Sequence, residues 1–146
     1  MSKVILVTGG SKGIGANIVE GLARKGYTVI LNYNNSEKEA KSIQNTLFQE
    51  NINIDIYQAD VSIHTEVTKL INYCINKYHK IDVLINNAGV SQTKLFTDIT
   101  DIDWYNMLQT NLTSAFYTIK DTLPCMIHNK NGCIINISSV WGLVGS

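Results

Sequence analysis

Val4-Ile5-Leu6-Val7-Thr8-Gly9-Gly10-Ser11-Lys12-Gly13-Ile14-Gly15 is the stretch that decides the fold, because an apolar run gives way there to glycines and then to a helical pattern. Four apolar residues in a row are typical of a strand buried on both faces of a parallel sheet. The glycines allow a tight turn and a close approach of the backbone to a ligand. Apolar residues then recur at helical spacing over residues 16–23, so the free N–H groups of a helix would face the loop. We predict a strand, a phosphate-binding loop and a helix, with a pyrophosphate as the simplest ligand.

The alternation of strand and helix continues along the chain. We predict further strands over residues 27–33, 53–57, 81–89 and 133–139. Ser36 and Ser62 are predicted to cap two of the intervening helices, and a longer helix is predicted over residues 102–129, kinked or ended early by Pro124. Strict alternation with short connections predicts an α/β fold with one doubly wound parallel sheet, the Rossmann fold. The chain of 146 residues is expected to form one domain over residues 1–146.

The charge balance excludes several classes of partner. The sequence has twelve acidic and twelve basic side chains and no basic run, so its charge does not favour binding to nucleic acid or to an anionic membrane surface. The first strand follows Met1 almost at once, and no apolar run approaches the ~18 residues of a membrane span, so we expect a cytoplasmic protein. Cys74, Cys125 and Cys133 lack metal-ligand spacing; we expect them to be reduced and mostly buried, with no metal site.

Small and polar residues follow each predicted strand. In doubly wound sheets the ligands bind at the carboxyl ends of the strands. These ends are residues 8–15, 32–35, 60–61, 86–89 and 138–139, so all of them should lie along one rim of the sheet. A dinucleotide is the ligand expected there.

Five motifs along this rim resemble those of the short-chain dehydrogenase/reductase family. They are Thr8-Gly9-x-x-x-Gly13-Ile14-Gly15, Asp60-Val61, Asn86-Asn87-Ala88-Gly89, Asn111 and Ile137-Ser138-Ser139. Within that family, residues 91–96 and 140–145 look like 3-oxoacyl-(acyl-carrier-protein) reductases of fatty acid biosynthesis and a related group that reduces a 5-aminopentanone modification of elongation factor P. The pair Trp141-Gly142 looks more like the second group, but these residues do not separate the two substrates. The resemblance implies an oxidoreductase that reduces a small-molecule or carrier-linked ketone to an alcohol.

The resemblance also implies roles for individual residues. The pyrophosphate and the adenosine ribose would be wrapped by Gly9, Ser11, Lys12, Gly13, Ile14 and Gly15. Asp60 and Val61 would hold the adenine, and Asn87, Ala88 and Gly89 would flank the nicotinamide ribose. Ser139 matches the catalytic serine that donates a hydrogen bond to the substrate carbonyl. Asn111 would kink the long helix and tie a water molecule into a proton relay.

The end of the second predicted strand bears on the choice of cofactor. An NAD enzyme of this kind is expected to carry a carboxylate there to bind the ribose 2′-OH. This chain has Asn32 and three further uncharged residues, so we assign Asn32 to the cofactor site, and no carboxylate at this position would repel a 2′-phosphate. Lys12 could pair with that phosphate. We therefore expect NADP(H) in preference to NAD(H).

The proton donor expected from the resemblance is not found after Ser139. That donor is the tyrosine of a Tyr-x-x-x-Lys motif, and losing a positioned acid typically costs ~10²–10⁴-fold in rate. The one such string, Tyr73 to Lys77, falls on a predicted helix before the fourth strand and cannot lie beside Ser139. We expect the chain to be the N-terminal portion of a longer enzyme and, alone, to lack reductase activity.

Three other interpretations fit parts of the sequence. Residues 9–13 match the G-x-S-x-G elbow of serine hydrolases, with Ser11 as nucleophile, but the three histidines fall in or at the ends of predicted helices. A P-loop NTPase has the glycine spacing but not the Lys-Ser/Thr pair, since Ala16-Asn17 stands there. A non-catalytic dinucleotide-binding module stays open.

The long predicted helix carries many large apolar residues, which we interpret as core and subunit contacts. In the resembling family this helix builds an oligomer contact together with the helix that follows it. We expect a homo-oligomer for the full-length protein and no tetramer for this chain.

Overall fold

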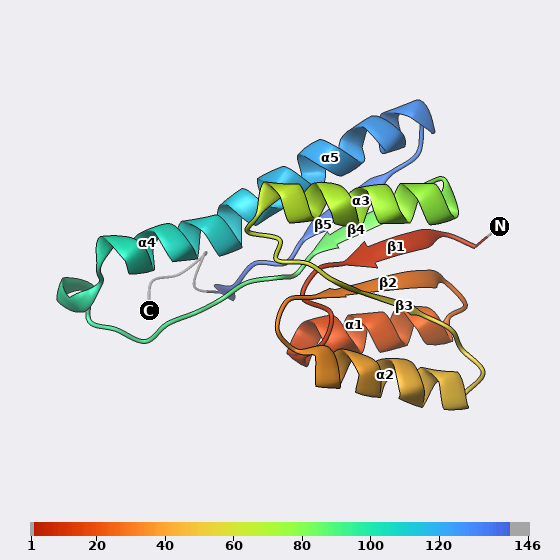
Figure 1. The fold of residues 1–146 in the computed structure, drawn as a ribbon, viewed down its shortest axis with the longest axis horizontal. Helices are drawn as coiled ribbons and strands as arrows, with labels where there is room; N and C mark the ends of the chain where they lie inside the picture. The colour runs from red at the N-terminus through yellow and green to blue at the C-terminus, as the bar shows by residue number, and fades with distance from the viewer. Residues whose placement is uncertain (1, 141–146) are drawn as a thin grey trace.

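Five parallel strands form a single sheet in the computed structural model, which describes residues 2–140. The sheet order is β3-β2-β1-β4-β5 (Figure 1). The strands are β1 (Val4–Val7), β2 (Thr28–Tyr33), β3 (Asp55–Gln58), β4 (Val83–Asn86) and β5 (Cys133–Asn136). The prediction of an α/β fold with a doubly wound parallel sheet is therefore confirmed.

Helices cover both faces of the sheet, as Figure 1 shows. One face carries α1 (Gly13–Arg24) and α2 (Glu37–Gln49), and the opposite face carries α3 (His64–Tyr78) and α5 (Ser114–His128). Between β4 and α5 lie the short 3₁₀ helix η1 (Phe96–Asp98), α4 (Asp101–Leu108) and the π-helical segment η2 (Gln109–Thr113). α4 projects beyond the carboxyl edge of the sheet (Figure 1).

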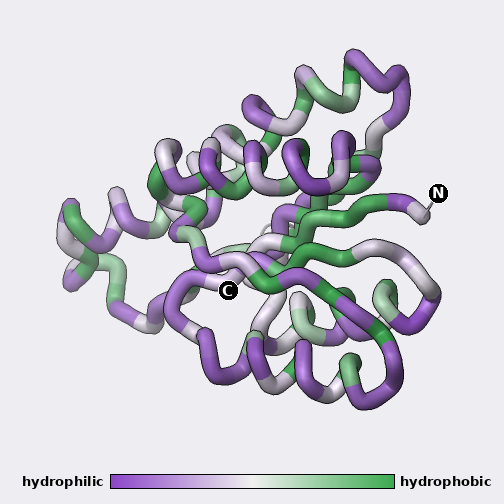
Figure 2. Tube along the Cα trace, turned by 45° about the vertical axis from the view of Figure 1, so that its right-hand side comes forward, coloured by the Kyte–Doolittle hydropathy of each residue, from purple (hydrophilic) through white to green (hydrophobic). Residues whose placement is uncertain are grey.

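The side chains of β1 alternate between two apolar cores. Val4 and Leu6 pack with α3 and α5, whereas Ile5 and Val7 pack with α1 and α2. All four residues are at most 3% exposed, as expected for a central strand covered on both sides. Figure 2 shows the hydrophobic colour concentrated along the inner strands and the hydrophilic colour along the outward sides of the helices.

Several predicted boundaries and caps were wrong. The strands end earlier than predicted, at Asn86 and Asn136, because the residues beyond them leave the ladder to form the rim. Ser36 occupies the N-cap position of α2 as predicted, but its side chain makes no capping hydrogen bond there. Ser62 does not cap α3, which begins at His64 with Ile63 at the N-cap position. The long helix is divided by η2, and Pro124 lies inside α5 without ending it, since a proline removes only one intrahelical donor.

The α1-side face of β5 is uncovered, whereas Ile85 of the neighbouring β4 is buried. A groove of about 400 Å³ lies there between α1 and the strands, lined mainly by Ile18, Leu22, Ile85, Ile135 and Ile137. Ile135 and Ile137 are 42% and 37% exposed. In the part of the chain that the structure describes, β5 pairs only with β4.

The three cysteines are free, but only Cys74 is buried. Burial raises the pKa of its thiol to about 12, so it stays protonated. Cys125 is half-buried and Cys133 is exposed on β5, so the prediction of burial was wrong for Cys133. Within residues 2–140, no helix combines the length and the apolar character that a membrane span requires.

Candidate functional site

The first rim segment is the turn after β1. Gly9 has φ of +61°, a left-handed conformation, and a Cβ on it would lie 2.8 Å from the Cα of Ala88. Glycine is therefore required by both conformation and space. The buried Thr8 hydroxyl accepts hydrogen bonds from the N–H groups of Asn87 (3.0 Å) and Ala88 (3.1 Å), which joins this turn to the segment after β4.

The start of α1 packs directly against the same segment. A Cβ on Gly15 would collide with the Gly9 carbonyl oxygen and with the Asn87 amide. That amide donates to the carbonyl oxygens of Thr8 (3.1 Å) and Gly9 (3.0 Å). The glycine loop, the N-terminus of α1 and the residues after β4 are thus one connected unit at the point where the strand order reverses. In doubly wound sheets this switch point is the ligand crevice.

Asn32 at the end of β2 is buried, with 1% of its surface exposed. Its side-chain amide donates to the Ala59 carbonyl oxygen (3.0 Å), and its backbone carbonyl accepts from the Gly10 N–H (2.8 Å). Asn32 therefore holds the ends of three strands together from inside, and the exposed positions at this strand end are Asn34 and Asn35.

Two contacts join the glycine loop to the first turn of α2. The Ser11 hydroxyl donates to the Ser36 hydroxyl (3.0 Å), and the Lys12 ammonium forms an ion pair with Glu39 (3.0 Å). Sequence reasoning assigned Ser36 and Glu39 only to the helix start. The contacts of Ser36 and Glu39 with the loop were not predicted, because they depend on how closely the ends of β1 and β2 lie in the folded sheet.

The third rim segment follows β3. The Asp60 carboxylate accepts from the N–H (2.9 Å) and the hydroxyl (2.6 Å) of Ser62, and the Asp60 N–H donates to Glu66 (2.6 Å). Val61 beside it is buried. Hydrogen bonds on both sides of the residue thus fix Asp60 at the rim.

Asn111 lies in η2 and faces the segment after β4. Its Oδ1 accepts from the Val90 N–H (2.7 Å), and its amide donates to the Val90 carbonyl oxygen (2.9 Å). Gly89 leaves the room for this contact, because a Cβ on it would lie 3.1 Å from the Asn111 Oδ1. The predicted distortion of the long helix at Asn111 is confirmed as a π-helical segment.

Ser139 is exposed and follows the end of β5, next to β4 in the sheet. The strand ends before it are tied by a polar chain: the Thr118 hydroxyl donates to Asn86 (2.7 Å), whose amide donates to Asn136 (2.9 Å). The Ile137 N–H also donates to the Asn86 carbonyl oxygen (2.8 Å). Of residues 140–145, quoted for the resemblance above, only Val140 lies within the described part of the chain.

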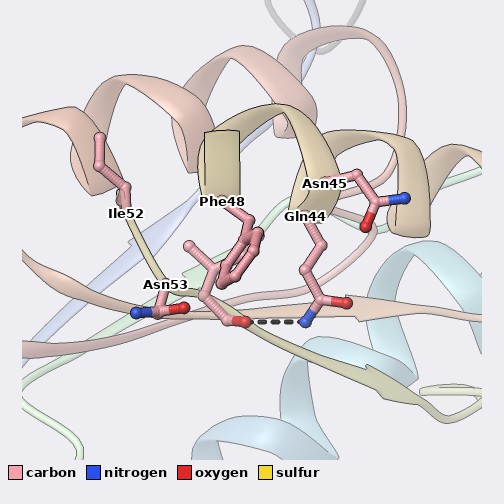
Figure 3. Close-up of a pocket in the computed structure, with 6 residues that line it drawn as sticks. Gln44, Asn45, Phe48, Ile52 and Asn53 are labelled. Carbon is pink, nitrogen blue, oxygen red and sulfur yellow. Dashed lines mark hydrogen bonds between the residues drawn. The ribbon is translucent and has the colours of Figure 1, made fainter. Parts of the chain in front are cut away.

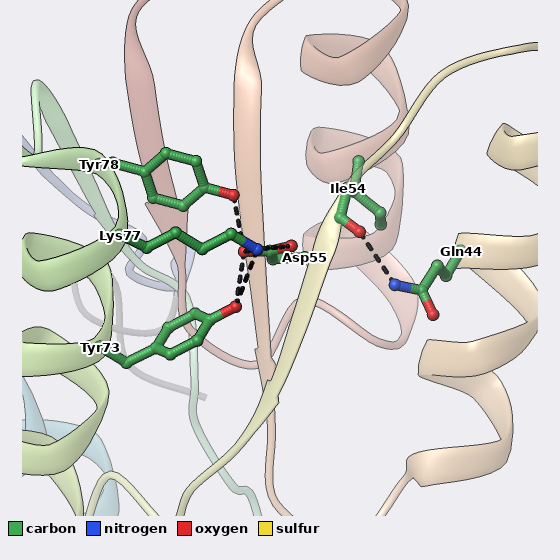
Figure 4. A network of polar contacts seen from close by, with 6 residues as sticks. All are labelled: Gln44, Ile54, Asp55, Tyr73, Lys77 and Tyr78. Atoms are coloured by element: carbon green, nitrogen blue, oxygen red, sulfur yellow. Dashed lines mark hydrogen bonds and ion pairs between the residues drawn. The ribbon is translucent and has the colours of Figure 1, made fainter.

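The Tyr73-x-x-x-Lys77 string lies beside the start of β3, away from the carboxyl ends of the strands, and Figure 4 shows its side chains around Asp55. Both side chains bind Asp55, the first residue of β3: the Tyr73 hydroxyl at 2.7 Å and the Lys77 ammonium at 2.7 Å. The Tyr78 hydroxyl donates to the same carboxylate at 2.6 Å. The expectation that this string has no place beside Ser139 is confirmed.

A small cavity of about 180 Å³ lies beside the C-terminal turns of α2, also away from the rim (Figure 3). Gln44 lines it and donates to the Ile54 carbonyl oxygen (2.9 Å). Since its lining holds no titratable side chain, this cavity is not a candidate for catalysis.

The hydrolase interpretation finds no support in the geometry. Ser11 donates to Ser36, and among the described residues no imidazole is hydrogen-bonded to it. His64 instead pairs with Asp121 (3.0 Å) and stacks on Tyr117, between α3 and α5.

Comparison with known proteins agrees with this geometry. The family model of short chain dehydrogenases matches residues 3–146. The chain is 36% identical over 146 residues to the 3-oxoacyl-(acyl-carrier-protein) reductase FabG of Staphylococcus aureus strain Mu50, and 36% identical over 147 residues to the uncharacterized oxidoreductase YmfI of Bacillus subtilis. It spans 59% and 60% of their lengths, and 100% of this chain is covered in both.

Two similar solved structures contain NADPH or NADP. One is a variant of actinorhodin polyketide ketoreductase with NADPH, with a TM-score of 0.93 and 31% identity over 99% of this chain and 56% of that one. The other is a metagenomic short-chain oxidoreductase with NADP, with a TM-score of 0.92 and 27% identity over 99% of this chain and 65% of that one. On the strength of the matching family model and of these relatives, the chain belongs to the short-chain dehydrogenase family.

Proposed function

We propose that this chain binds NADP(H) along the rim and supplies the cofactor-binding part of an oxidoreductase that reduces a ketone to an alcohol. One observation carries the proposal: the glycine loop, the start of α1 and the residues after β4 form one connected unit at the switch point of the sheet. Gly9 and Gly15 allow the loop, the helix and the strand end to pack together, because a Cβ on either would meet protein atoms. The N-terminus of α1 would thus face the crevice in which a dinucleotide pyrophosphate would bind.

The residues divide between the parts of the cofactor. The glycine loop from Gly9 to Gly15 would hold the pyrophosphate, Asp60 and Val61 the adenine, and the segment from Asn87 to Gly89 the nicotinamide ribose. Asn32 contributes by keeping the ends of β1, β2 and β3 in place. When bound, the cofactor supplies a hydride, and the chain orients it.

NADP(H) is favoured over NAD(H) by the polar residues at the end of β2. No carboxylate occupies that strand end. Lys12 lies near it, because its ammonium pairs with Glu39 in the helix that directly follows β2. The two solved relatives that hold NADPH and NADP support the same preference.

On the substrate side we propose a small-molecule or carrier-linked ketone, by analogy with the reductases that this chain resembles. Ser139 would donate a hydrogen bond to the ketone oxygen, and Asn111 would hold a water molecule of the proton relay. In the whole protein, α4, η2 and α5 would contribute a homo-oligomer contact through their exposed Trp104, Tyr105, Leu112 and Phe116.

Titration with NADPH tests the proposal, with nicotinamide fluorescence as the readout. Gly15→Ala should weaken binding by roughly tenfold or more, since an overpacked site costs about 1–3 kcal/mol. Gly21→Ala is the matched control on the same helix: a Cβ there meets nothing within 4 Å, so NADPH binding should stay as in the unmodified chain. Equal binding by both variants, with unchanged circular dichroism, would contradict the proposed site.

A turnover assay separates the binding role from catalysis. The 146-residue chain should bind NADPH without oxidising it when a 3-oxoacyl thioester is added, because the sequence holds no Tyr-x-x-x-Lys after Ser139. Oxidation of NADPH above the rate without protein would show that another group donates the proton.

A further inference from the structure

Lys12, the only cationic residue of the glycine loop, already forms an ion pair within the chain. Its ammonium lies 3.0 Å from the Glu39 carboxylate in the first turn of α2. The neighbouring Ser11–Ser36 contact joins the same two segments, so both contacts link the glycine loop to the start of α2, which follows the end of β2 after a short connection. Both partners are substantially exposed, at 63% and 46%, and a dinucleotide can therefore reach them.

Two anions would then compete for one ammonium. A phosphate monoester carries about −1.5 to −2 charges at neutral pH and three acceptor oxygens, so it is the stronger partner for a lysine. Glu39 is ionised under the same conditions, since the hydrogen bond from Lys12 lowers the pKa of its carboxyl group. A phosphate that takes Lys12 must therefore break the ion pair and also lie near an unpaired carboxylate.

We propose that Glu39 is a specificity-determining residue, which competes with the 2′-phosphate of NADP(H) for Lys12. This competition makes the preference of the site for NADP(H) over NAD(H) smaller than it would be without Glu39. The inference rests on the proposed function, because it concerns the same binding site. NAD(H) has a hydroxyl group instead of the phosphate at this position and does not compete with Glu39 for Lys12, so Glu39→Gln should leave its affinity unchanged.

The other carboxylate in this helix turn provides a matched control. Glu37 forms an ion pair with Lys41 (2.7 Å) within α2, and no hydrogen bond or ion pair joins its carboxylate to the glycine loop in the part of the chain that the structure describes. Glu37→Gln removes the same charge from the same helix end as Glu39→Gln. A difference between the two variants therefore reports the contact with Lys12 and not the net charge.

The test measures the affinities of the 146-residue chain and its variants for NADPH and NADH by fluorescence titration. Glu39→Gln should tighten NADPH binding about twofold to fivefold, the range that an exposed ion pair supports, and leave NADH binding unchanged. Glu37→Gln should change neither. In a Lys12→Gln background the gain from Glu39→Gln should fall by at least half, and added salt should reduce it.

Four results would overturn the inference: no effect of Glu39→Gln on NADPH binding, an equal effect on both cofactors, an equal effect of Glu37→Gln, or a gain that persists in full without Lys12. If the unmodified chain binds NADPH but Glu39→Gln has no effect, only the role of Glu39 fails. If the unmodified chain binds neither dinucleotide, the proposed function itself fails.

Discussion

Asp55 concentrates more polar contacts than any other single carboxylate described above. One ammonium and two phenol groups donate to it, from Lys77, Tyr73 and Tyr78 (Figure 4). Burial disfavours the charge, but these hydrogen bonds outweigh burial and hold the pKa of Asp55 below its usual value. Burial and the hydrogen bond to Asp55 likewise raise the pKa of Tyr78, so that phenol keeps its proton. The group fastens β3, an edge strand, to α3.

Asp55→Asn should therefore change the acid limb of the stability profile. A carboxyl group with a lowered folded-state pKa stabilises the fold above its unfolded pKa of about 4, and this stabilisation is lost as pH falls through the folded value. The difference in unfolding free energy between the unmodified chain and Asp55→Asn should be largest at neutral pH and shrink below about pH 4. Urea unfolding at a series of pH values measures it.

Asp98→Asn serves as the control, because within residues 2–140 the Asp98 carboxylate accepts a hydrogen bond only from the neighbouring Thr97 hydroxyl (3.2 Å). Its stability profile should run parallel to that of the unmodified chain. A constant offset for Asp55→Asn over the whole pH range would mean that the charge of Asp55 does not contribute.

For individual residues, the sequence predicted backbone conformation better than it predicted which side chains contact one another. Gly9 and Gly15 could be assigned from the spacing alone, since the strand–loop–helix turn imposes their geometry whatever surrounds it. The pairing of Lys12 with Glu39 could not, because it depends on how closely two loops approach, and no local pattern encodes that distance. Asn32 was assigned to the cofactor by its position, yet its burial shows that it acts through the strand ends.

Among the elements, η2 is the one that a helical pattern hides. The apolar spacing predicted one continuous helix over residues 102–129, but a π-helical segment separates α4 from α5. One extra residue in a turn hardly disturbs a hydrophobic pattern, whereas it turns Asn111 toward Val90. The family resemblance located this distortion, and the periodicity alone did not.

Asn111→Ala should loosen the segment after β4 without unfolding the domain. It removes the acceptor of the Val90 N–H and the donor to the Val90 carbonyl. A hydrogen bond contributes roughly 0.5–1.5 kcal/mol, so the protection of the Val90 amide against hydrogen exchange should fall about threefold to tenfold.

Asn106→Ala is the matched change on α4, where no hydrogen bond of the Asn106 side chain is found in the described structure. Protection at Val90 should then be unaltered. Equal loss in both variants would show that helix propensity, and not the side-chain contact, governs this segment.

The whole molecule is unequally covered. β1, β2 and β3 are packed on both faces, whereas β5 lies open on the α1 side, where Ile135 and Ile137 are exposed. A strand edge with exposed apolar residues is a site of self-association. The alternation of strand and helix predicted the layers correctly, but strand propensity is the same for a covered strand and a bare one, so the sequence pattern did not show which face is open.

Ile135→Lys should therefore lower the tendency of the chain to associate. A charge on this bare face opposes strand addition, and analytical ultracentrifugation over a range of concentrations would detect a larger monomer fraction. Phe48→Lys makes the same apolar-to-cationic change on α2, at a side chain that is 66% exposed (Figure 3), and should have a smaller effect. The opposite ranking of the two variants would place the association surface on α2.

The sheet order has a consequence for the time course of folding. Chain order and sheet order differ only at the β1–β4 seam, where the Val4 N–H donates to Asp82, 78 positions away. Contacts between neighbours in the chain close small loops and form early, whereas this seam must close the longest one. During synthesis on the ribosome, β1, β2 and β3 can assemble before β4 has emerged. The crevice at the switch point is then completed last. A ligand bound there would therefore lower the rate of unfolding more than it would raise the rate of folding.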